Sequence, residues 1–488
     1  MSGQISMLAP VTEPSDPNGF LTRAGSVVLD GSPDLDAALA VLGSGLPVTL
    51  PDGRATEHIN LDYAATAPCL AAAATAINQL LPWYASVHRG AGAASQRCTL
   101  AYERARQTIG DFVGARADDH VIFTRNTTDS LNLLARCVPA GTTVVGWSGE
   151  HHANLLPWSS LDSIALPVPA SPEAAVHGLD AALGGLDATP GGPVLVTVTG
   201  ASNVTGEIWP LEALTEVAHR HGARIAVDAA QLAPHRPVCM AEGGIDYLAL
   251  SGHKLYAPFG AGVLVGRDDW LDAAPPYLAG GGATAYVGAS LVSDALPARP
   301  HLIGLDPAGE RVSFDVRWHD GPARHEAGTP NLFGAVALAA VCEALAAADR
   351  AALAVEESRL VQRLRAGLAA LPGVGELRTF GPEEDRVGIV SFAVAGVRAS
   401  DVSAHLATRH GIGVRDGLFC AHPLAKRLLE DASGRVGHDL GASAVRASIG
   451  LGSTAAHVDK LIAGVRELTS FSTLPASARP GQTPSCHS

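Results

Sequence analysis

Short apolar runs alternate with stretches of helical spacing between about residues 120 and 265. The runs are rich in Val, Ile and Leu and short, which is typical of strands buried on both faces. The stretches between them repeat apolar residues every three or four positions, which predicts amphipathic helices. This alternation predicts an α/β fold in which a largely parallel sheet is covered by helices on both faces. The predicted strands are 120–126, 142–147, 193–200, 223–228, 245–250 and 261–265, and the predicted helices are 127–137 and 211–222.

A second, smaller α/β unit follows after about residue 335. Its predicted helices are 334–349, 353–371, 401–411 and 455–468, and its predicted strands include 387–394, 414–420 and 445–452. The first 55 residues are rich in Pro, Gly, Ser and Asp, with one helix-like patch at 33–42, and the last residues are polar and contain Pro. We therefore predict an extension (1–55), a large domain (56–335), a small C-terminal domain (336–470) and a disordered tail (471–488).

Several chemically versatile residues follow predicted strands directly. Thr127, Asp228 and Ser251 each come at the carboxyl end of a different strand, and Lys254 follows in SGHKLYAPFG. Ligands of parallel sheets bind at this edge, so these residues are expected in one cleft. A lysine attacks a carbonyl group only when it is deprotonated, and burial among apolar neighbours lowers its pKa. Lys254 is therefore a candidate for Schiff-base chemistry.

Composition limits the classes of function. The 488 residues include 34 Lys and Arg against 48 Asp and Glu, a net charge of -14, which argues against nucleic acid or an anionic membrane as partner. No apolar run approaches the roughly 20 residues of a membrane span, and the N-terminus lacks the pattern of a signal peptide, so we expect a cytoplasmic protein. Seven scattered cysteines without a CxxC pair indicate reduced thiols and no metal site.

The residues around Lys254 match the needs of pyridoxal phosphate (PLP), an electron-sink cofactor that requires a lysine, a carboxylate at its ring nitrogen and a phosphate cradle. Asp228 in VDAAQ suits the ring nitrogen, and Gln231 suits the ring oxygen. A helix that begins at Thr127 and Thr128 offers free N–H groups to a phosphate. Taken singly, these residues are equally well explained as helix caps, turns or core hydrogen bonds. Further candidates are Ser251 and His253 for the phosphate and His151 in GEHHANLLPW for stacking on the ring.

Several ordered motifs carry a resemblance to a known family. They are NLDYAATAP (60–68), SVHRG (86–90), TRNTTDSLNLLA (124–135), EHHANLLPW (150–158), ASNVTGE (201–207), VDAAQ (227–231), SGHKLYAPFGAGVL (251–264), HEAGTPN (325–331), VRDGLFCAHPL (414–424) and VRASIGLGST (445–454). The chain resembles the class V aminotransferase-fold PLP enzymes, in their cysteine desulfurase and selenocysteine lyase branch.

The resemblance implies PLP-dependent transferase fold type I, with a mainly parallel seven-stranded sheet in the large domain. It also implies a homodimer with shared active sites, because Thr329 in HEAGTPN would reach the phosphate of the neighbouring subunit. The implied cofactor contacts are Lys254, Asp228, His151, Thr127, Thr128, Asn203, Gln231, Ser251 and His253, and the implied substrate contacts are Arg446, Asn203, Arg415 and His88.

Cys420 distinguishes between activities within this fold. In desulfurases a loop cysteine a few residues after an arginine takes the sulfur of L-cysteine as a persulfide and leaves L-alanine, and Cys420 follows Arg415 by five residues. His151, Lys254 and Cys420 are then the catalytic residues, and an acceptor protein receives the sulfur. Two histidines commonly precede that cysteine, whereas Leu418 and Phe419 do so here. Relative to the family that the chain resembles, about residues 283–323 and 425–443 are extra chain, and both segments are expected to border the site.

Two alternatives remain open from the sequence. The first is another PLP reaction on the same scaffold, such as a C–S lyase, an aminotransferase or an epimerase, in which Cys420 is structural. The second is a non-catalytic partner or scaffold that retains the fold, which the presence of Lys254 and Asp228 disfavours.

Overall fold

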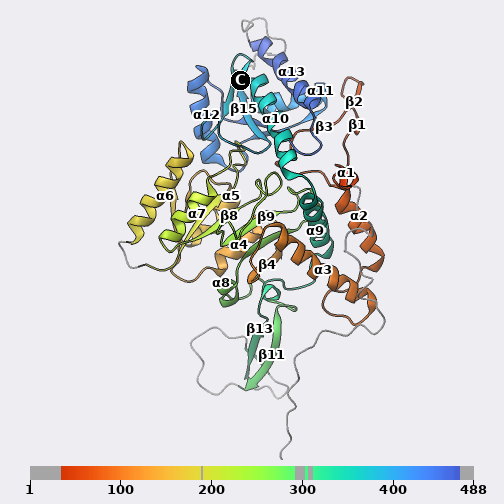
Figure 1. The fold of residues 1–488 in the computed structure, drawn as a ribbon, viewed down its shortest axis with the longest axis vertical. Coiled ribbons are helices and arrows are strands. Elements are labelled where there is room, and N and C mark those ends of the chain that lie inside the picture. Colours follow the sequence, from red (N-terminus) through yellow and green to blue (C-terminus); the bar gives the residue numbers. More distant parts are fainter. Residues whose placement is uncertain (1–34, 188–190, 292–302, 306–310, 473–488) are drawn as a thin grey trace, which may run out of the picture.

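The computed structural model describes residues 35–187, 191–291, 303–305 and 311–472 (Figure 1). The greater part of the expected extension and the expected tail from residue 473 lie outside the described residues. The described residues form two α/β units, each a sheet with its covering helices, which are called the larger and the smaller layer. The two layers are stacked along the long axis, and a small sheet projects from the far end of the larger layer.

The larger layer is built on a seven-stranded sheet with the order β4-β10-β9-β8-β7-β5-β6. The pairings from β9 to β6 are all parallel, whereas β10 pairs antiparallel with both β4 and β9. The α/β fold with a mainly parallel sheet is therefore confirmed. The strands are β4 (Asp119–Thr124), β5 (Thr143–Trp147), β6 (Asp162–Leu166), β7 (Val194–Thr199), β8 (Arg224–Asp228), β9 (Tyr247–Ser251) and β10 (Gly262–Arg267).

Alternate residues of each central strand enter different apolar clusters. Ile225 and Val227 of β8 pack in the cluster that includes the helices of one face, whereas Ala226 packs with Leu131 and Leu134 on the other. A sheet apolar on both faces needs helices on both, which explains the unbroken apolar runs of the sequence. The helices of this layer are α2 (Ala71–Leu80), α3 (Ala93–Phe112), α4 (Thr127–Cys137), α5 (His152–Leu155), α6 (Pro172–Asp187), α7 (Leu211–Arg220), α8 (Asp268–Ala273) and α9 (Leu332–Ala347).

The smaller layer is a four-stranded antiparallel sheet with the order β14-β15-β18-β17, covered by helices. An apolar cluster joins the sheet to α10, α11 and α13. Its elements are α10 (Arg350–Ala369), β14 (Val374–Leu377), β15 (Ile389–Val394), α11 (Ala399–His410), β16 (Ile412–Gly413), β17 (Arg415–Gly417), α12 (His422–Val436), β18 (Ala444–Ser448) and α13 (Ala455–Ser472).

Residues near the N-terminal end of the described chain pack on the C-terminal layer. β3 (Ile59–Asn60) pairs in parallel with β16, and Ile59 and Leu61 belong to the apolar cluster of the smaller layer. The hairpin of β1 (Pro47–Thr49) and β2 (Ala55–Glu57) lies beside α11, where Arg54 donates to the carbonyl oxygen of Arg409. A short helix, α1 (Leu35–Ala38), precedes the hairpin. This segment therefore links the two layers.

The two segments of extra chain take different forms. Within 283–323, β11 (Thr284–Leu291), β12 (Ile303–Leu305) and β13 (Arg311–Trp318) make an antiparallel sheet, seen at the bottom of Figure 1. Within 425–443, most residues continue α12.

No single helix among the described residues is long and apolar enough to cross a membrane. Among the described helices, only α9 and α10 taken together have the length and apolar composition of a membrane span, and the two helices are bent by 90° to each other.

Candidate active site

A cavity of ≈ 230 Å³ lies between the two layers, beyond the carboxyl ends of β8 and β9. The fold delivers residues to it from the N-terminus of α4, the turns after β8 and β9, and the loop after β17. The predicted residues that line it together are Thr127, Thr128, His151, Asn203, Asp228, Gln231, Ser251, His253, Lys254, Arg415, Cys420 and Arg446.

Lys254 lies in the turn that follows β9. Burial lowers the pKa of its amine to about 8, partly opposed by the Asp228 carboxylate and assisted by the Arg446 guanidinium. About a tenth of the amine is therefore unprotonated at pH 7, far more than for an ordinary lysine, and this is the form in which a lysine attacks a carbonyl group.

Asp228 ends β8 and is buried. Its Oδ1 atom accepts a 2.9 Å hydrogen bond from the Ala230 N–H. Burial raises the pKa of this carboxyl, while Lys254 and the Ala230 hydrogen bond lower it. A cationic partner would stabilise a carboxylate in this place, because a buried charge is stable only when it is paired.

The N-terminus of α4 forms an anion cradle. The Thr127 N–H donates to Ser251 Oγ at 2.8 Å, and the Asn126 side chain caps the helix by accepting from the Asp129 N–H. The Thr128 amide is then the first-turn donor without an acceptor among the described residues. His253 also lines the cavity, and its Nδ1 atom lies 3.0 Å from Thr66 Oγ1.

His151 is held in one neutral form. Its Nδ1 atom accepts a 3.0 Å hydrogen bond from the Ala153 N–H, so the ring proton lies on Nε2. Burial, followed by the charge of Lys254, lowers the pKa of the imidazole to about 3. An uncharged ring in the cavity suits stacking on a flat cofactor.

Arg446 is buried on β18, where Nη1 donates to the Asn203 carbonyl oxygen at 3.0 Å and Nη2 lies 3.3 Å from Asp62 Oδ1. Its Nε atom is buried and has no partner among the described residues. Arg446 thus keeps a donor for a further anion. Arg415, opposite Arg446 on β17, is exposed at the cavity.

The loop after β17 holds Cys420 in an exposed position at the cavity. Phe419 and Cys420 both have φ = 54°, in the left-handed region that non-glycine residues rarely adopt. Asn203 Nδ2 donates to the Phe419 carbonyl oxygen, and the His152 N–H donates to that of Cys420. The Phe419 ring is buried, with the Arg446 guanidinium 5.2 Å from its centroid.

Comparisons with known proteins agree with this geometry. The aminotransferase class-V family matches residues 59–461, most of the chain. This chain belongs to the class-V aminotransferase family. A cysteine desulfurase from Klebsiella pneumoniae (strain 342) is 34% identical over 394 residues, 79% of this chain and 86% of that protein. A probable cysteine desulfurase from Vibrio cholerae serotype O1 is 32% identical over 395 residues, 78% of this chain and 86% of that protein.

Solved structures of the cysteine desulfurase branch share the fold of this class-V chain. The apo cysteine desulfurase of Thermococcus onnurineus NA1 has a TM-score of 0.68 at 30% identity, covering 85% of this chain and 95% of that one. A cysteine desulfurase from Escherichia coli in an S-sulfonic acid form has a TM-score of 0.66 at 30% identity, with the same coverage. Fold type I and the cysteine desulfurase branch are thereby confirmed.

PLP is the cofactor that membership of the class-V family implies, and the cavity fits it. The cavity offers a buried carboxylate in Asp228, a lysine of lowered pKa, a neutral imidazole and the hydroxyl and amide donors at Thr127, Thr128 and Ser251. Gln231 Nε2 donates to the Ala64 carbonyl oxygen, which leaves a buried Oε1 unpaired among the described residues.

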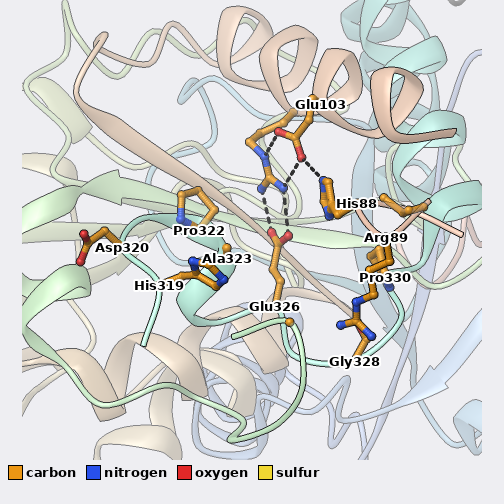
Figure 2. A pocket seen from close by; sticks show the side chains of 13 residues that line it. His88, Arg89, Glu103, His319, Asp320, Pro322, Ala323, Glu326, Gly328 and Pro330 are labelled. Atoms are coloured by element: carbon orange, nitrogen blue, oxygen red, sulfur yellow. Dashed lines mark hydrogen bonds and ion pairs between the residues drawn. The ribbon is translucent and has the colours of Figure 1, made fainter. Parts of the chain in front are cut away.

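Two predicted residues lie outside this cavity. His88 lines a second cavity of ≈ 450 Å³, where its Nε2 atom is 2.8 Å from Glu103 Oε1 (Figure 2). Arg106 pairs with both Glu103 and Glu326 beside it. Thr329 is exposed on the loop between Gly328 and Pro330, which line the same second cavity. Neither residue lines the Lys254 cavity within this chain.

Several residues that support the site were not predicted from the sequence. Asp62 lies in the NLDYAATAP motif and pairs with Arg446, so that motif was the available signal. His152 acts through its backbone N–H, Thr66 through its hydroxyl and Phe419 through its ring and carbonyl, and none of these contacts follows a periodic pattern.

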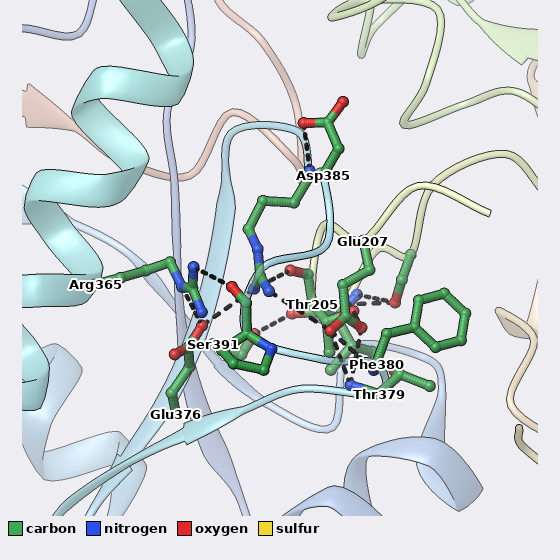
Figure 3. A network of polar contacts seen from close by, with 12 residues as sticks. Thr205, Glu207, Arg365, Glu376, Thr379, Phe380, Asp385 and Ser391 are labelled. Carbon is green, nitrogen blue, oxygen red and sulfur yellow. Dashed lines mark hydrogen bonds and ion pairs between the residues drawn. The ribbon is translucent and has the colours of Figure 1, made fainter. Parts of the chain in front are cut away.

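A polar network around Glu207 lies next in sequence to Asn203 and includes Thr205 (Figure 3). Glu207 is fully buried, and it accepts hydrogen bonds from Thr205 Oγ1 and from the N–H groups of Thr379 and Phe380. Arg386 lies 3.6 Å from Glu207 and 3.1 Å from Glu376. The network joins this segment to the smaller layer.

Proposed function

We propose that this protein is a PLP-dependent cysteine desulfurase that converts L-cysteine to L-alanine and takes the sulfur on Cys420 as a persulfide. The observation that carries the proposal is the exposed Cys420 thiol at the cavity that holds Lys254, Asp228 and Arg446. The relatives and solved structures that match most of the chain bear the same activity in their names.

Each residue has a defined task in this reaction. Bound PLP supplies an electron sink for the bonds at the substrate's Cα. Arg446 and Asn203 bind the substrate carboxylate, since a guanidinium suits that group. Lys254 in its amine form takes the Cα proton and returns it later. With PLP bound, the neutral His151 imidazole would stack on the ring, and Asp228 would balance the charge at the ring nitrogen.

Cys420 performs the sulfur transfer. As a thiolate it attacks the substrate sulfur; a new S–S bond forms while the substrate's Cβ–S bond breaks, and the electron pair of that bond stays with carbon. Protonation of that carbon gives the methyl group of alanine. The persulfide left on Cys420 is then available to an acceptor.

The partners belong to the same proposal. A homodimer with shared active sites places Thr329 of the partner subunit at the phosphate and brings the second cavity, with His88, toward the subunit boundary. A cytoplasmic acceptor protein takes the persulfide sulfur from the exposed Cys420. The absence of basic excess in the composition agrees with an amino-acid substrate and a protein acceptor rather than nucleic acid.

The test is direct. Purified enzyme with PLP is incubated with L-cysteine and a thiol reductant, and sulfide and alanine are measured. Equal amounts of both products are expected, lost in Cys420→Ala and retained in Cys239→Ala, the matched control. Formation of neither product would refute the proposal.

A second candidate is another PLP reaction in which Cys420 is structural. The observation that favours it is the pair Leu418 and Phe419, which stand where desulfurases commonly have two histidines, with Phe419 buried against Arg446. Unchanged turnover of amino-acid substrates in Cys420→Ala would select this candidate over the persulfide route.

A further inference from the structure

Two histidines of α11 and one glutamate of α13 form a cluster on the C-terminal layer, away from the Lys254 cavity. Glu467 Oε2 lies 3.0 Å from His405 Nε2 and 3.3 Å from His410 Nε2. One nitrogen or oxygen of each residue lies within 4.8 Å of the others. Three side chains from two helices thus point at one place.

These separations suit ligands of a single ion. Zinc binds imidazole nitrogen and carboxylate oxygen at about 2.0–2.2 Å, so neighbouring ligand atoms of a tetrahedral site lie about 3.3 Å apart. Two imidazoles and one carboxylate form a ligand set typical of zinc and similar divalent transition metals, whereas calcium and magnesium prefer oxygen alone. The donor types therefore favour a transition metal over calcium or magnesium, and the two separations from Glu467 are compatible with one.

The scaffold under the cluster is fixed by apolar packing. Leu406 of α11 and Leu461 and Val465 of α13 are buried in one cluster. A Cβ atom at Gly464 would lie 2.7 Å from Leu406 Cδ2 and 3.2 Å from His410 Nε2, so a side chain there would force Leu406 and His410 to shift. The helices hold the three side chains close together before any ion binds, which lowers the entropic penalty of forming a site.

Burial and charge also suit a bound cation. The imidazoles are only 17% and 16% exposed, while Glu467 is 49% exposed. One side of the cluster is therefore open to entry of an ion and to water as a further ligand. The nearby Arg409 is exposed, so solvent screens its repulsion of a cation.

We propose that His405, His410 and Glu467 bind one divalent transition-metal ion of the Zn²⁺ type, with water completing its coordination. The ion cross-links α11 to α13. Ser403 on α11 donates to Asp416 of β17 at 2.8 Å, four residues before Cys420, so the site stiffens the element that leads into that loop. The proposal does not depend on the proposed function.

The test uses the full chain with PLP bound, in a Cys420→Ser background so that a thiolate does not compete for metal. The protein is stripped with a chelator and titrated with Zn²⁺ alone, followed by calorimetry and elemental analysis. One equivalent per chain with micromolar or tighter affinity is expected. His405→Ala and His410→Ala are each expected to weaken binding at least 30-fold, and Glu467→Gln at least 10-fold.

The matched control is His457→Ala. His457 Nε2 lies 3.4 Å from Glu57 Oε1, a pair with one imidazole and one carboxylate, and its loss should leave the zinc equivalent intact. Thermal melting without metal checks that each variant folds, and Zn²⁺ should raise the melting temperature of the parent but not of His410→Ala. The proposal is overturned if the stripped parent takes up no zinc or if the His405→Ala/His410→Ala double variant still binds one equivalent.

Discussion

The side-chain amide of Asn203 donates a 2.7 Å hydrogen bond to the carbonyl oxygen of Phe419, the residue directly before Cys420. Phe419 and Cys420 both occupy left-handed backbone, which costs on the order of 1–3 kcal/mol for each such residue. The loop therefore keeps its shape because outside groups hold it. Asn203 and the His152 amide are two such groups.

Replacing Asn203 with alanine should release this loop. The buried Phe419 carbonyl loses its partner, which costs about 1–3 kcal/mol and frees the strained backbone. We expect sulfide formation from L-cysteine to fall at least tenfold and alkylation of Cys420 by iodoacetamide to become faster. The alkylation rate tests the loop alone, because Asn203 is also assigned to the substrate carboxylate and turnover reports on both roles. An unchanged alkylation rate would show that Asn203 does not fix the loop. Asn132→Ala, which removes an exposed amide bonded within α4, is the control.

The lowered pKa of Lys254 predicts how cofactor attachment depends on pH. The folded chain holds this pKa near 8, against 10.5 for an ordinary lysine, so the reactive free amine increases as the pH rises through about 8. The rate at which the PLP-free chain captures PLP, followed by absorbance, should rise with a midpoint near pH 8. A midpoint near pH 10 would contradict burial of the amine.

Asp228→Asn tests whether the Asp228 carboxylate sets the pKa of Lys254. The Asp228 carboxylate raises the lysine pKa, so its neutral analogue should shift the midpoint of PLP capture below pH 8. The variant should also bind PLP more weakly, because the carboxylate for the ring nitrogen is lost. A midpoint that moves upward would show that Asp228 does not act on Lys254.

Phe419 should affect substrate binding through Arg446. The ring contact at 5.2 Å is of a kind that contributes about 0.5–2 kcal/mol, equivalent to about 2- to 30-fold in binding. Phe419→Ala is expected to raise KM for L-cysteine within that range while the PLP absorbance is unchanged. Leu418→Ala, next to it in the loop, is the matched control. An equal rise of KM in both variants would rule out a specific contact with Arg446.

Glu207 should be important for stability. It is fully buried, lies 3.6 Å from the buried guanidinium of Arg386 and accepts hydrogen bonds from three groups (Figure 3), so Glu207→Gln removes one of the two carboxylates of that guanidinium and weakens its acceptors. Loss of one partner of a buried ion pair costs about 3–5 kcal/mol. Chemical denaturation should show a loss of about 3 kcal/mol, with a smaller loss for Glu376→Gln, whose side chain is 23% exposed. A loss below about 1 kcal/mol in Glu207→Gln would contradict this role.

Much of the site could be predicted because parallel strands end at one edge of a sheet. The ends of β8 and β9 bring Asp228 and Lys254 together with the start of α4, as the apolar runs and the turn residues indicated. The strand and helix ends differ from the predicted ones by a few residues, since caps and backbone hydrogen bonds set them.

The remaining features depend on contacts between distant segments. The pairing of β3 with β16 and the ion pair of Asp62 with Arg446 join residues more than 350 positions apart. The NLDYAATAP motif marks Asp62, but no local pattern predicts its partner or the pairing of the strands. The same holds for the cluster of His405, His410 and Glu467, which only the packing of α11 on α13 creates.

The central claim is that Cys420 takes the substrate sulfur, and peptide mass spectrometry tests it most directly. The PLP-loaded enzyme is incubated with L-cysteine without reductant, free thiols and persulfides are alkylated, and the peptide that contains Cys420 is analysed. We predict one added sulfur atom on Cys420, absent in Lys254→Ala, with alanine formed in step. Alanine formed at the full rate while Cys420 carries no added sulfur would contradict the account.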